Sequence, residues 1–393
     1  PQNNEKLRTL RHFVRSIKFN VPFLSGNEKD YINEVFDAQE FAGNGRFTKR
    51  AQKMLENMLG AERVLLTHSC TGALEMAAML AGFGPGDEVL VPSYTFVTSA
   101  SSVMRTGATP VFCEIDEETM LLDLDDVEAK INSKTRGIVA VDYAGFGLDY
   151  TRIDALCSKH NLVCIEDAAQ GLGSEWNNQP LGTHTRFGTI SFHQTKNIHS
   201  GLGGCLVLND ANDVAKAEMI WERGTNRSAF FKGLVDKYNW QVVGSSFYPS
   251  ELQAAFLCAQ LEQLDDNLSR RMELWNHYEK SLSLLENSGE FRVLRQPKKC
   301  KHNAHMMALV LPSPEEADRA RLYLNENGVQ AVIHYVPLHQ SPVGKELGYD
   351  EHQLPITSKT AASLIRLPLH LDMNKDDVEH VVKILRELYP QLD

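Results

Sequence analysis

Between Glu62 and Asp167 the sequence alternates short apolar runs with stretches of helical periodicity, and this alternation restricts the fold more than any other feature. The runs are almost wholly apolar, which indicates strands that are buried on both faces. Helices between such strands build a mostly parallel sheet with right-handed crossovers. The pattern therefore predicts an α/β domain with strands at 63–69, 88–92, 109–116, 135–144 and 162–167.

The pattern changes after the apolar run at 203–208. There we predict one long helix from Ser250 to Leu282, then strands at 306–311 and 329–338 and helices at 314–328 and 375–389. A chain of 393 residues exceeds the size at which one core keeps growing, so two domains are expected. We place an N-terminal arm and a large domain in 1–260, and a smaller α+β domain in 261–393. The first ~20 residues are expected to form the arm or to be disordered.

Composition narrows the classes of function. The net charge of −11 argues against non-specific binding to nucleic acid, which needs a basic surface. No apolar run reaches the ~18 residues that cross a bilayer, and the polar first residues lack the apolar stretch of a signal peptide. The seven cysteines are odd in number and form no CxxC pair, so neither a disulfide framework nor a metal site is predicted. We expect a cytoplasmic protein that binds neither nucleic acid nor membrane.

Polar residues follow several predicted strands, at the ends where ligands of parallel sheets bind. The segment SCTG at 69–72 opens a helix, so it suits either an ordinary N-cap or a bound phosphate. Asp167 ends a buried strand and either caps the next helix or pairs with a cation. Lys196 follows the strand that ends at Ser191, although a lysine in a loop is usually a solvated surface charge. Taken singly, each residue favours the structural role.

Together these features match the requirements of pyridoxal 5'-phosphate. Its phosphate needs N–H and hydroxyl donors, its ring nitrogen needs an anion, and its aldehyde needs a lysine amine. Phe96 lies just past another strand and is well placed against a flat ring, although a single aromatic residue more often packs in a core. The combination predicts a pyridoxal-phosphate enzyme with Lys196 as its nucleophile.

At these residues the chain resembles a known family. The segments GDEVLVPSYTFVTSA, VCIEDAAQGLGS and SFHQTKN are similar to the DegT/DnrJ-type nucleotide-sugar aminotransferases, which have fold type I of the pyridoxal-phosphate enzymes. The segments GNGRFTKR, GSSFYPSELQAA and HYVPLH resemble one branch, the TDP-4-oxo-6-deoxy-D-glucose 4-aminotransferases. The resemblance implies an α/β fold with a large, mostly parallel sheet and a smaller C-terminal α+β domain.

The resemblance also implies roles for single residues. Lys196 matches the lysine that bonds to the cofactor aldehyde, and Asp167 matches the partner of the ring nitrogen. The other implied cofactor contacts are Gln170 near the ring hydroxyl, Cys70, Thr71, Gly72 and Ser191 at the phosphate, and Phe96 against the ring. Ser246 departs from the family pattern, because many members have an asparagine there that reaches the phosphate across a dimer interface. Serine still donates a hydrogen bond but has a shorter reach.

The implied reaction moves an amino group from L-glutamate to C4 of TDP-4-keto-6-deoxy-D-glucose. The product is a TDP-4-amino-4,6-dideoxyhexose for O-antigen or another surface polysaccharide, with the galacto form preferred and the gluco form as its rival. The substrate-side candidates are Asn44, Phe47, Arg223, Arg227, Tyr335 and His339. The two arginines suit a diphosphate, although an arginine is more often part of a surface ion pair. His339 is equally compatible with a structural role.

Three alternatives are weighed against this reading. A 3-keto nucleotide sugar is the main rival substrate. A pyridoxal-dependent sugar dehydratase is disfavoured, because that sister group carries histidine where this chain has Lys196. A protein that only binds a ligand would need a degraded lysine or aspartate.

The last expectation concerns the oligomeric state of the protein. The aromatic-rich stretch at 225–240 exposes apolar surface unless something covers it. We expect a homodimer with shared active sites to cover it. The alternative is a lid that folds back over its own domain.

Overall fold

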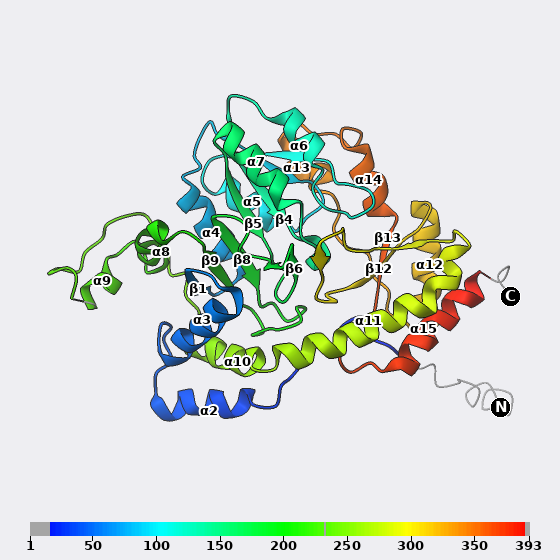
Figure 1. The fold of residues 1–393 in the computed structure, drawn as a ribbon, viewed down its shortest axis with the longest axis horizontal. Helices are drawn as coiled ribbons and strands as arrows, with labels where there is room; N and C mark the ends of the chain where they lie inside the picture. The colour runs from blue at the N-terminus through cyan, green and yellow to red at the C-terminus, as the bar shows by residue number, and fades with distance from the viewer. Residues whose placement is uncertain (1–15, 232, 390–393) are drawn as a thin grey trace, which may run out of the picture.

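The computed structural model describes residues 16–231 and 233–389. Its centre is a seven-stranded sheet (Figure 1) in the order β1-β9-β8-β5-β4-β2-β3. Five neighbouring strands of this sheet run parallel, and β9 alone runs antiparallel to both β1 and β8. The strands are β1 (Arg63–Thr67), β2 (Glu88–Pro92), β3 (Thr109–Cys113), β4 (Thr135–Val141), β5 (Val163–Asp167), β8 (Phe187–Ser191) and β9 (Gly204–Leu208). The predicted mostly parallel sheet is confirmed.

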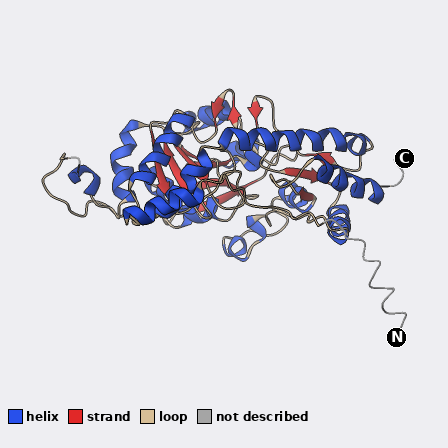
Figure 2. Cartoon of the chain, turned by 90° about the horizontal axis from the view of Figure 1, so that it is seen from below, coloured by secondary structure: helices blue, strands red, loops and turns tan. Residues whose placement is uncertain are grey.

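Helices cover both faces of this sheet (Figure 2), as the apolar strands require. In β1, Val64 and Leu66 face the core cluster that includes α3, α7 and α10, whereas Leu65 faces the cluster of α4, α5 and α8. The helices of this part of the chain are α2 (Glu28–Ala38), α3 (Arg46–Leu59), α4 (Cys70–Ala81), α5 (Thr98–Met104), α6 (Leu124–Lys130), α7 (Tyr150–His160), α8 (Val214–Trp221) and α10 (Glu251–Leu261), while α9 (Arg227–Phe231) lies on a segment that projects away from the sheet.

A second core lies beyond α10. The antiparallel sheet β10 (Arg292–Val293), β12 (Met307–Val310) and β13 (Leu364–Leu367) packs with α11 (Leu264–Asn287), α12 (Pro314–Glu326) and α15 (Lys375–Leu388). A small sheet of β6 (Glu175–Trp176), β7 (Gln179–Pro180) and β11 (Cys300–Lys301) links the two parts. Within the described ranges, no helix is long and apolar enough to span a bilayer.

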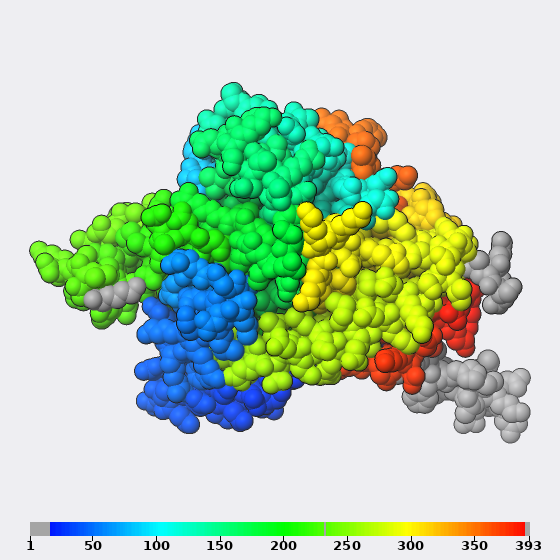
Figure 3. Space-filling view, in the orientation of Figure 1, coloured from blue at the N-terminus to red at the C-terminus, as the bar shows by residue number. Residues whose placement is uncertain are grey.

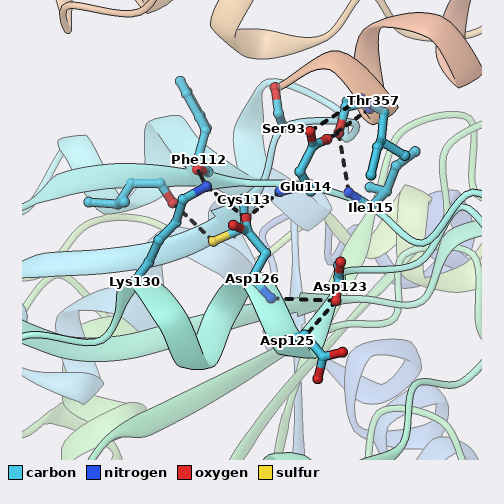
Figure 4. A network of polar contacts seen from close by, with 12 residues as sticks. Ser93, Phe112, Cys113, Glu114, Ile115, Asp123, Asp125, Asp126, Lys130 and Thr357 are labelled. Atoms are coloured by element: carbon cyan, nitrogen blue, oxygen red, sulfur yellow. Dashed lines mark hydrogen bonds and ion pairs between the residues drawn. The ribbon is translucent and has the colours of Figure 1, made fainter. Parts of the chain in front are cut away.

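The C-terminal part also sends a segment back onto the large sheet. It contains α13 (Pro342–Glu346) and α14 (Pro355–Ala362). The buried carboxylate of Glu114, just after β3, accepts hydrogen bonds from the backbone N–H groups of Ile356 at 3.2 Å and Thr357 at 2.8 Å (Figure 4). The division of the chain at residue 260 therefore stays a prediction, since residues on both sides of it share contacts.

Two predicted elements are wrong, and a third lies mostly outside the described residues. The long helix is interrupted between Leu261 and Leu264, where the N–H of Gln263 bonds to Gln260 in a tighter turn. The segment 329–338 is not a strand, because only Val329 and Val332 form isolated bridges, and the rest of the segment turns along a cavity. Most of the predicted N-terminal arm, residues 1–15, lies outside the described residues.

Candidate active site

A cavity of about 500 Å³ lies where the carboxyl ends of the parallel strands meet the C-terminal part. The large sheet contributes residues that follow β1, β2, β5 and β8, and the C-terminal part contributes β13 and the segment before α13. The lining residues that matter here are Phe19, Ser69, Cys70, Thr71, Phe96, Asp167, Ser191, Lys196, His334, Tyr335 and Arg366. A larger cavity of about 770 Å³ lies at the opposite ends of the strands, but neither Lys196 nor Asp167 lines it. The smaller cavity is therefore the candidate site.

Lys196 lies in the loop between β8 and β9, and its half-buried side chain reaches this cavity. Its backbone N–H donates to the carbonyl of His193 at 2.8 Å, which closes a tight turn. Burial lowers the pKa of the amine to about 8, and the positive charge of Arg366 acts in the same direction. The nearby Cys70 and Asp167 oppose that shift. A substantial fraction of the amine is thus neutral near pH 8, as a nucleophile or base requires.

The residue after the lysine anchors the loop to the C-terminal part. Asn197 is buried, donates to the carbonyl of Asn303 at 2.9 Å, and lies 3.2 Å from Nδ1 of His305. Asn303 in turn donates to the carbonyls of Gln170 and Leu172 at 2.7 and 2.9 Å. These bonds fix the position of the Lys196 loop relative to the segment after β5.

Asp167 ends β5 as a buried carboxylate. Its Oδ2 accepts a hydrogen bond from Ser99 Oγ at 2.6 Å, and its Oδ1 accepts one from the N–H of Ala169 at 3.2 Å. Burial raises the pKa of this carboxyl, and the two hydrogen bonds together with the charge of Lys196 offset part of that rise. A buried anion aimed at the cavity is the partner that a protonated ring nitrogen needs. Sequence reasoning did not find Ser99.

The first turn of α4 borders the same cavity through Ser69, Cys70 and Thr71. Ser69 is an ordinary N-cap, because its Oγ accepts from the N–H of Gly72 at 3.1 Å. Gly72 itself does not line the cavity, and its N–H is used by this cap. The remaining free N–H groups of the turn, the Thr71 hydroxyl and Ser191 suit a phosphate at a helix N-terminus. The two readings of this segment are compatible.

A glycine allows the close packing behind this turn. Gly204 begins β9 directly against the start of α4, and a Cβ atom there would lie 2.4 Å from the backbone nitrogen of Cys70. No side chain fits at that distance. Gly204 therefore serves backbone packing next to the first turn of α4.

Aromatic rings form one wall of the cavity. Phe96 is 53% exposed, and its ring centroid lies 6.0 Å from that of Tyr335. Gln170 does not line the cavity, but its Nε2 donates to the Tyr335 hydroxyl at 3.3 Å and its Oε1 accepts from the N–H of Ala144 at 2.7 Å. Gln170 therefore holds Tyr335 in place. Phe96 and Tyr335 both line the cavity, and Gln170 contacts Tyr335 from outside it.

Other predicted substrate contacts lie away from this cavity. Phe47 is a core residue that is 2% exposed, and the apolar packing of α3 explains its burial. His339 is fully buried and hydrogen-bonded through both ring nitrogens, to Ser93 at 2.7 Å and Ser358 at 3.0 Å. These contacts make it a structural histidine. Neither residue lines the cavity.

The remaining four predicted residues gather outside the cavity. Asn44 donates to Glu222 Oε1 at 3.0 Å, and Ser246 forms a backbone bridge with Glu222. Arg223 follows Glu222 and contacts the Tyr248 ring and hydroxyl. Arg227, on α9, stacks over the Phe231 ring at 5.1 Å. Asn44, Arg223 and Ser246 thus form one cluster around Glu222, and Arg227 is exposed nearby along the chain.

Sequence reasoning also missed three cavity residues from distant segments, Phe19, His334 and Arg366. Arg366 carried a readable signal, because it is the single charged residue in the apolar strand LIRL. Phe19 and His334 carried none, since only the fold brings the N-terminal segment and the stretch before α13 to this cavity.

The sheet and the cavity define a class of protein. A mostly parallel seven-stranded sheet with a lysine and a buried aspartate at its carboxyl edge is fold type I of the pyridoxal-phosphate-dependent transferases. The model of the DegT/DnrJ/EryC1/StrS aminotransferase family matches residues 23–386. The chain belongs to that family. The resemblance seen in the sequence is confirmed at the family level, while the particular branch stays a prediction.

Known proteins are similar to this chain over nearly its whole length. The GDP-perosamine synthase of Escherichia coli O157:H7 is 30% identical over 372 residues, which are 94% of this chain and 97% of that protein. The aminotransferase TlmJ from Streptoalloteichus hindustanus is 27% identical, with a TM-score of 0.87 over 96% of this chain and 100% of that chain. The PMP-form of the putative sugar aminotransferase Spr1654 from Streptococcus pneumoniae, at 24% identity, shares the fold with a TM-score of 0.87 over 96% of this chain and 100% of that one.

Proposed function

We propose that this sugar aminotransferase moves an amino group from L-glutamate to C4 of TDP-4-keto-6-deoxy-D-glucose and yields a TDP-4-amino-4,6-dideoxyhexose. The observation that carries the amino transfer is the pairing of Lys196, with a pKa lowered to about 8, and the buried Asp167 in one cavity. The choice of C4 and TDP rests on the segments that resemble the 4-aminotransferase branch. Its use in O-antigen or another surface polysaccharide, and a cytoplasmic location, belong to the same proposal.

The residues of the cavity fit pyridoxal 5'-phosphate, which is the cofactor. Thr71, Cys70 and Ser191 would hold its phosphate, Asp167 its ring nitrogen, and Phe96 one face of its ring. When bound, the cofactor supplies an electron sink that stabilises negative charge on the substrate carbon. The buried carboxylate of Asp167 keeps the ring nitrogen protonated, so that the sink stays effective.

Lys196 performs the proton chemistry of the chain. Its Nζ, when neutral, takes the proton from the substrate carbon that bears the nitrogen and returns a proton on the way to product. The bonds of Asn197 to the C-terminal part hold the loop that presents this amine. The aromatic wall of Phe96 and Tyr335 excludes water from one side of the reacting atoms.

One assay tests this function. The holoenzyme would be given L-glutamate with TDP-4-keto-6-deoxyglucose, with its GDP-linked counterpart, or with a 3-keto nucleotide sugar, and the product would be analysed by NMR. We expect amination at C4 of the TDP sugar, preferentially with galacto stereochemistry. The GDP sugar is the second candidate, because three similar relatives are named GDP-perosamine synthase. Faster turnover of the GDP or 3-keto sugar, or loss of the hydroxyl without amine transfer, would contradict the proposal.

A homodimer with shared active sites is also proposed. The segment around α9 projects away from the rest of the chain (Figure 3) and carries the exposed Phe231 and Trp240. In the nearby cluster of Asn44, Arg223 and Ser246, the buried Glu222 Oε2 has no hydrogen-bond partner among residues 16–231 and 233–389. A second copy would supply both the cover and the missing partner.

Mixing inactive subunits tests the shared site. A Lys196→Ala protein would be exchanged with a double variant that combines Ser246→Trp with Arg227→Glu. Each homodimer should be inactive, whereas the mixed dimer should regain activity at the one site built from two intact halves. A monomer in sedimentation, or no recovery after exchange is proven, would contradict shared sites and favour a lid.

A further inference from the structure

Two of the seven cysteines lie side by side at the edge of the large sheet opposite to Lys196. Cys157 lies in the last turn of α7 and Cys164 near the start of β5, with six residues between them in the chain. Both line the cavity of about 770 Å³, and Cys157 packs against the apolar cluster to which Cys164 belongs. The thiol of Cys164 donates a hydrogen bond to the sulfur of Cys157. The fold therefore builds a pair of thiols that amino transfer does not use.

The turn between α7 and β5 holds this pair in place. The carbonyl of Cys157 accepts hydrogen bonds from the N–H groups of Asn161 and Leu162, the latter at 2.9 Å. Asn161 ends the helix in the left-handed conformation, with a φ of 54°. Beyond the turn, Cys164 stands opposite Ile138 of β4 in the parallel sheet. Both cysteines thus belong to fixed elements, and their sulfur atoms already touch.

The two thiols differ in acidity. The hydrogen bond from Cys164 lowers the pKa of Cys157, although burial and the charge of Asp154 oppose that shift. The same bond, together with burial, raises the pKa of Cys164 well above its usual range. Cys157 is the one cysteine of the seven whose pKa is lowered, whereas burial raises the pKa of Cys300 to about 11. Because the thiolate is the reactive form, Cys157 is the nucleophile of the pair.

A small reagent in solution can reach Cys157. Its side chain is half-buried, whereas Cys164 behind it is only 7% exposed. The exposed residues Asp154, Asn161 and Arg186 line the same cavity, so the cavity opens to solvent. The proposed catalytic lysine lies at the other edge of the sheet. A reaction at the thiol pair therefore needs no cofactor.

We propose that Cys157 and Cys164 are a redox-active pair that a hydroperoxide converts into an internal disulfide. In the first step the thiolate of Cys157 attacks one peroxide oxygen, the O–O bond breaks, and a sulfenic acid and hydroxide form. In the second step the sulfur of Cys164 attacks the sulfur of Cys157, the S–O bond breaks, and the thiol proton leaves with the hydroxyl group as water. With hydrogen peroxide, the two thiols lose two electrons and two protons, and the peroxide becomes two water molecules.

Peptide mapping tests this directly, because trypsin cuts after Lys159 and so separates the two cysteines. Holoenzyme would be treated with hydrogen peroxide, alkylated, digested and analysed by mass spectrometry, with and without dithiothreitol. The same treatment would be given to Cys157→Ala and Cys164→Ala. Cys300→Ala is the matched control, because Cys300 is also half-buried but its sulfur accepts from the N–H of Gly147 at 3.3 Å.

We expect peptides 153–159 and 160–186 to be joined in the oxidised wild type and in Cys300→Ala, and to separate with dithiothreitol. In Cys164→Ala, oxidation of Cys157 should stop at the sulfenic acid, which dimedone traps. In Cys157→Ala, Cys164 should stay reduced.

A rate measurement on the wild type checks the assignment without any variant. Iodoacetamide should alkylate Cys157 at least roughly tenfold faster than Cys300, because only the first has a lowered pKa. Three results would each overturn the proposal: no joined peptides in the oxidised wild type, alkylation of Cys157 no faster than of Cys300, or undiminished oxidation of Cys164 in Cys157→Ala.

Discussion

The cavity and the projecting segment at 225–245 differ in how well contacts within one chain bury their side chains and pair their polar groups. In the cavity, Asp167 is bonded to Ser99, and Asn197 is bonded to Asn303. In the projecting segment, Trp240 is 75% exposed and Leu234 is 72% exposed. The cavity is held by contacts within one chain, whereas the segment leaves large apolar groups in water.

This difference separates two kinds of functional residue. Residues of the cavity are positioned by buried hydrogen bonds that one chain supplies, so their proposed roles can be tested one at a time. Phe231, Leu234 and Trp240 in the projecting segment lie largely exposed instead, and exposed apolar patches of this kind mark interaction surfaces. Substitutions in the cavity should therefore cause the largest losses of activity, and substitutions in the projecting segment should weaken self-association.

The largest loss of activity is expected when Lys196 is replaced. Lys196→Ala removes the nucleophile and the base together, so turnover should fall by at least about 10⁴-fold. Steady-state amination checks the loss, and the absorbance of the bound cofactor checks that its covalent bond to the chain is gone. The unfolding transition should stay cooperative. A variant that transaminates at a comparable rate would remove Lys196 from the chemistry.

Asp167 should be next in severity. Asp167→Asn keeps the shape and a hydrogen bond to Ser99 but loses the charge, so kcat should fall about a hundredfold while cofactor is still bound. Ser99→Ala serves as the matched variant, since it removes one bond to the same carboxylate, and about a tenfold loss is expected. Both are measured as kcat at saturating substrates. A near-normal kcat in Asp167→Asn would leave Asp167 as a helix cap only.

The pH at which the Lys196 amine loses its proton distinguishes it from an exposed lysine. Its pKa is about 8 in the folded chain, so the neutral fraction should rise about tenfold between pH 7 and 9 and then level off. The rate at which apoprotein recombines with the cofactor measures this amine. Because the folded pKa lies below the unfolded value, this residue adds stability as pH rises from about 8 to 10.5. A rate that keeps rising about tenfold per pH unit beyond 9 would mean an unperturbed amine.

The smallest effect on the stability of a single chain is expected from substitutions in the projecting segment. Replacing Phe231 and Trp240 by serine should change the free energy of unfolding of a dissociated chain by less than about 0.5 kcal/mol. The same double variant should weaken self-association, which sedimentation equilibrium measures. Leu282→Ala, at a residue with no exposure in the second core, is the contrasting variant and should cost about 2–5 kcal/mol. A large loss of stability in the double serine variant would show that the segment packs on its own domain.

Much of the large domain was predictable from sequence because its signals are local. Each apolar run between 63 and 167 contained a strand, and each helical pattern between the runs contained a helix. The long helix and the segment 329–338 could not be assigned correctly, because breaking the helix and turning the segment depend on packing between distant parts. At the site, Lys196, Asp167 and Thr71 were found for the same local reason, since each follows a strand at the edge where ligands bind.

The sequence by itself determined the parallel sheet, the edge of the sheet at which the cavity lies and several of the residues that line it, because periodicity and strand ends are properties of neighbouring residues. The tertiary structure alone decided which distant groups join them. It brought Phe19 and Arg366, 347 positions apart, to one cavity, and it buried Phe47 and His339 away from that cavity. Contacts between residues so far apart are set by the packing of whole elements, and no local pattern encodes them.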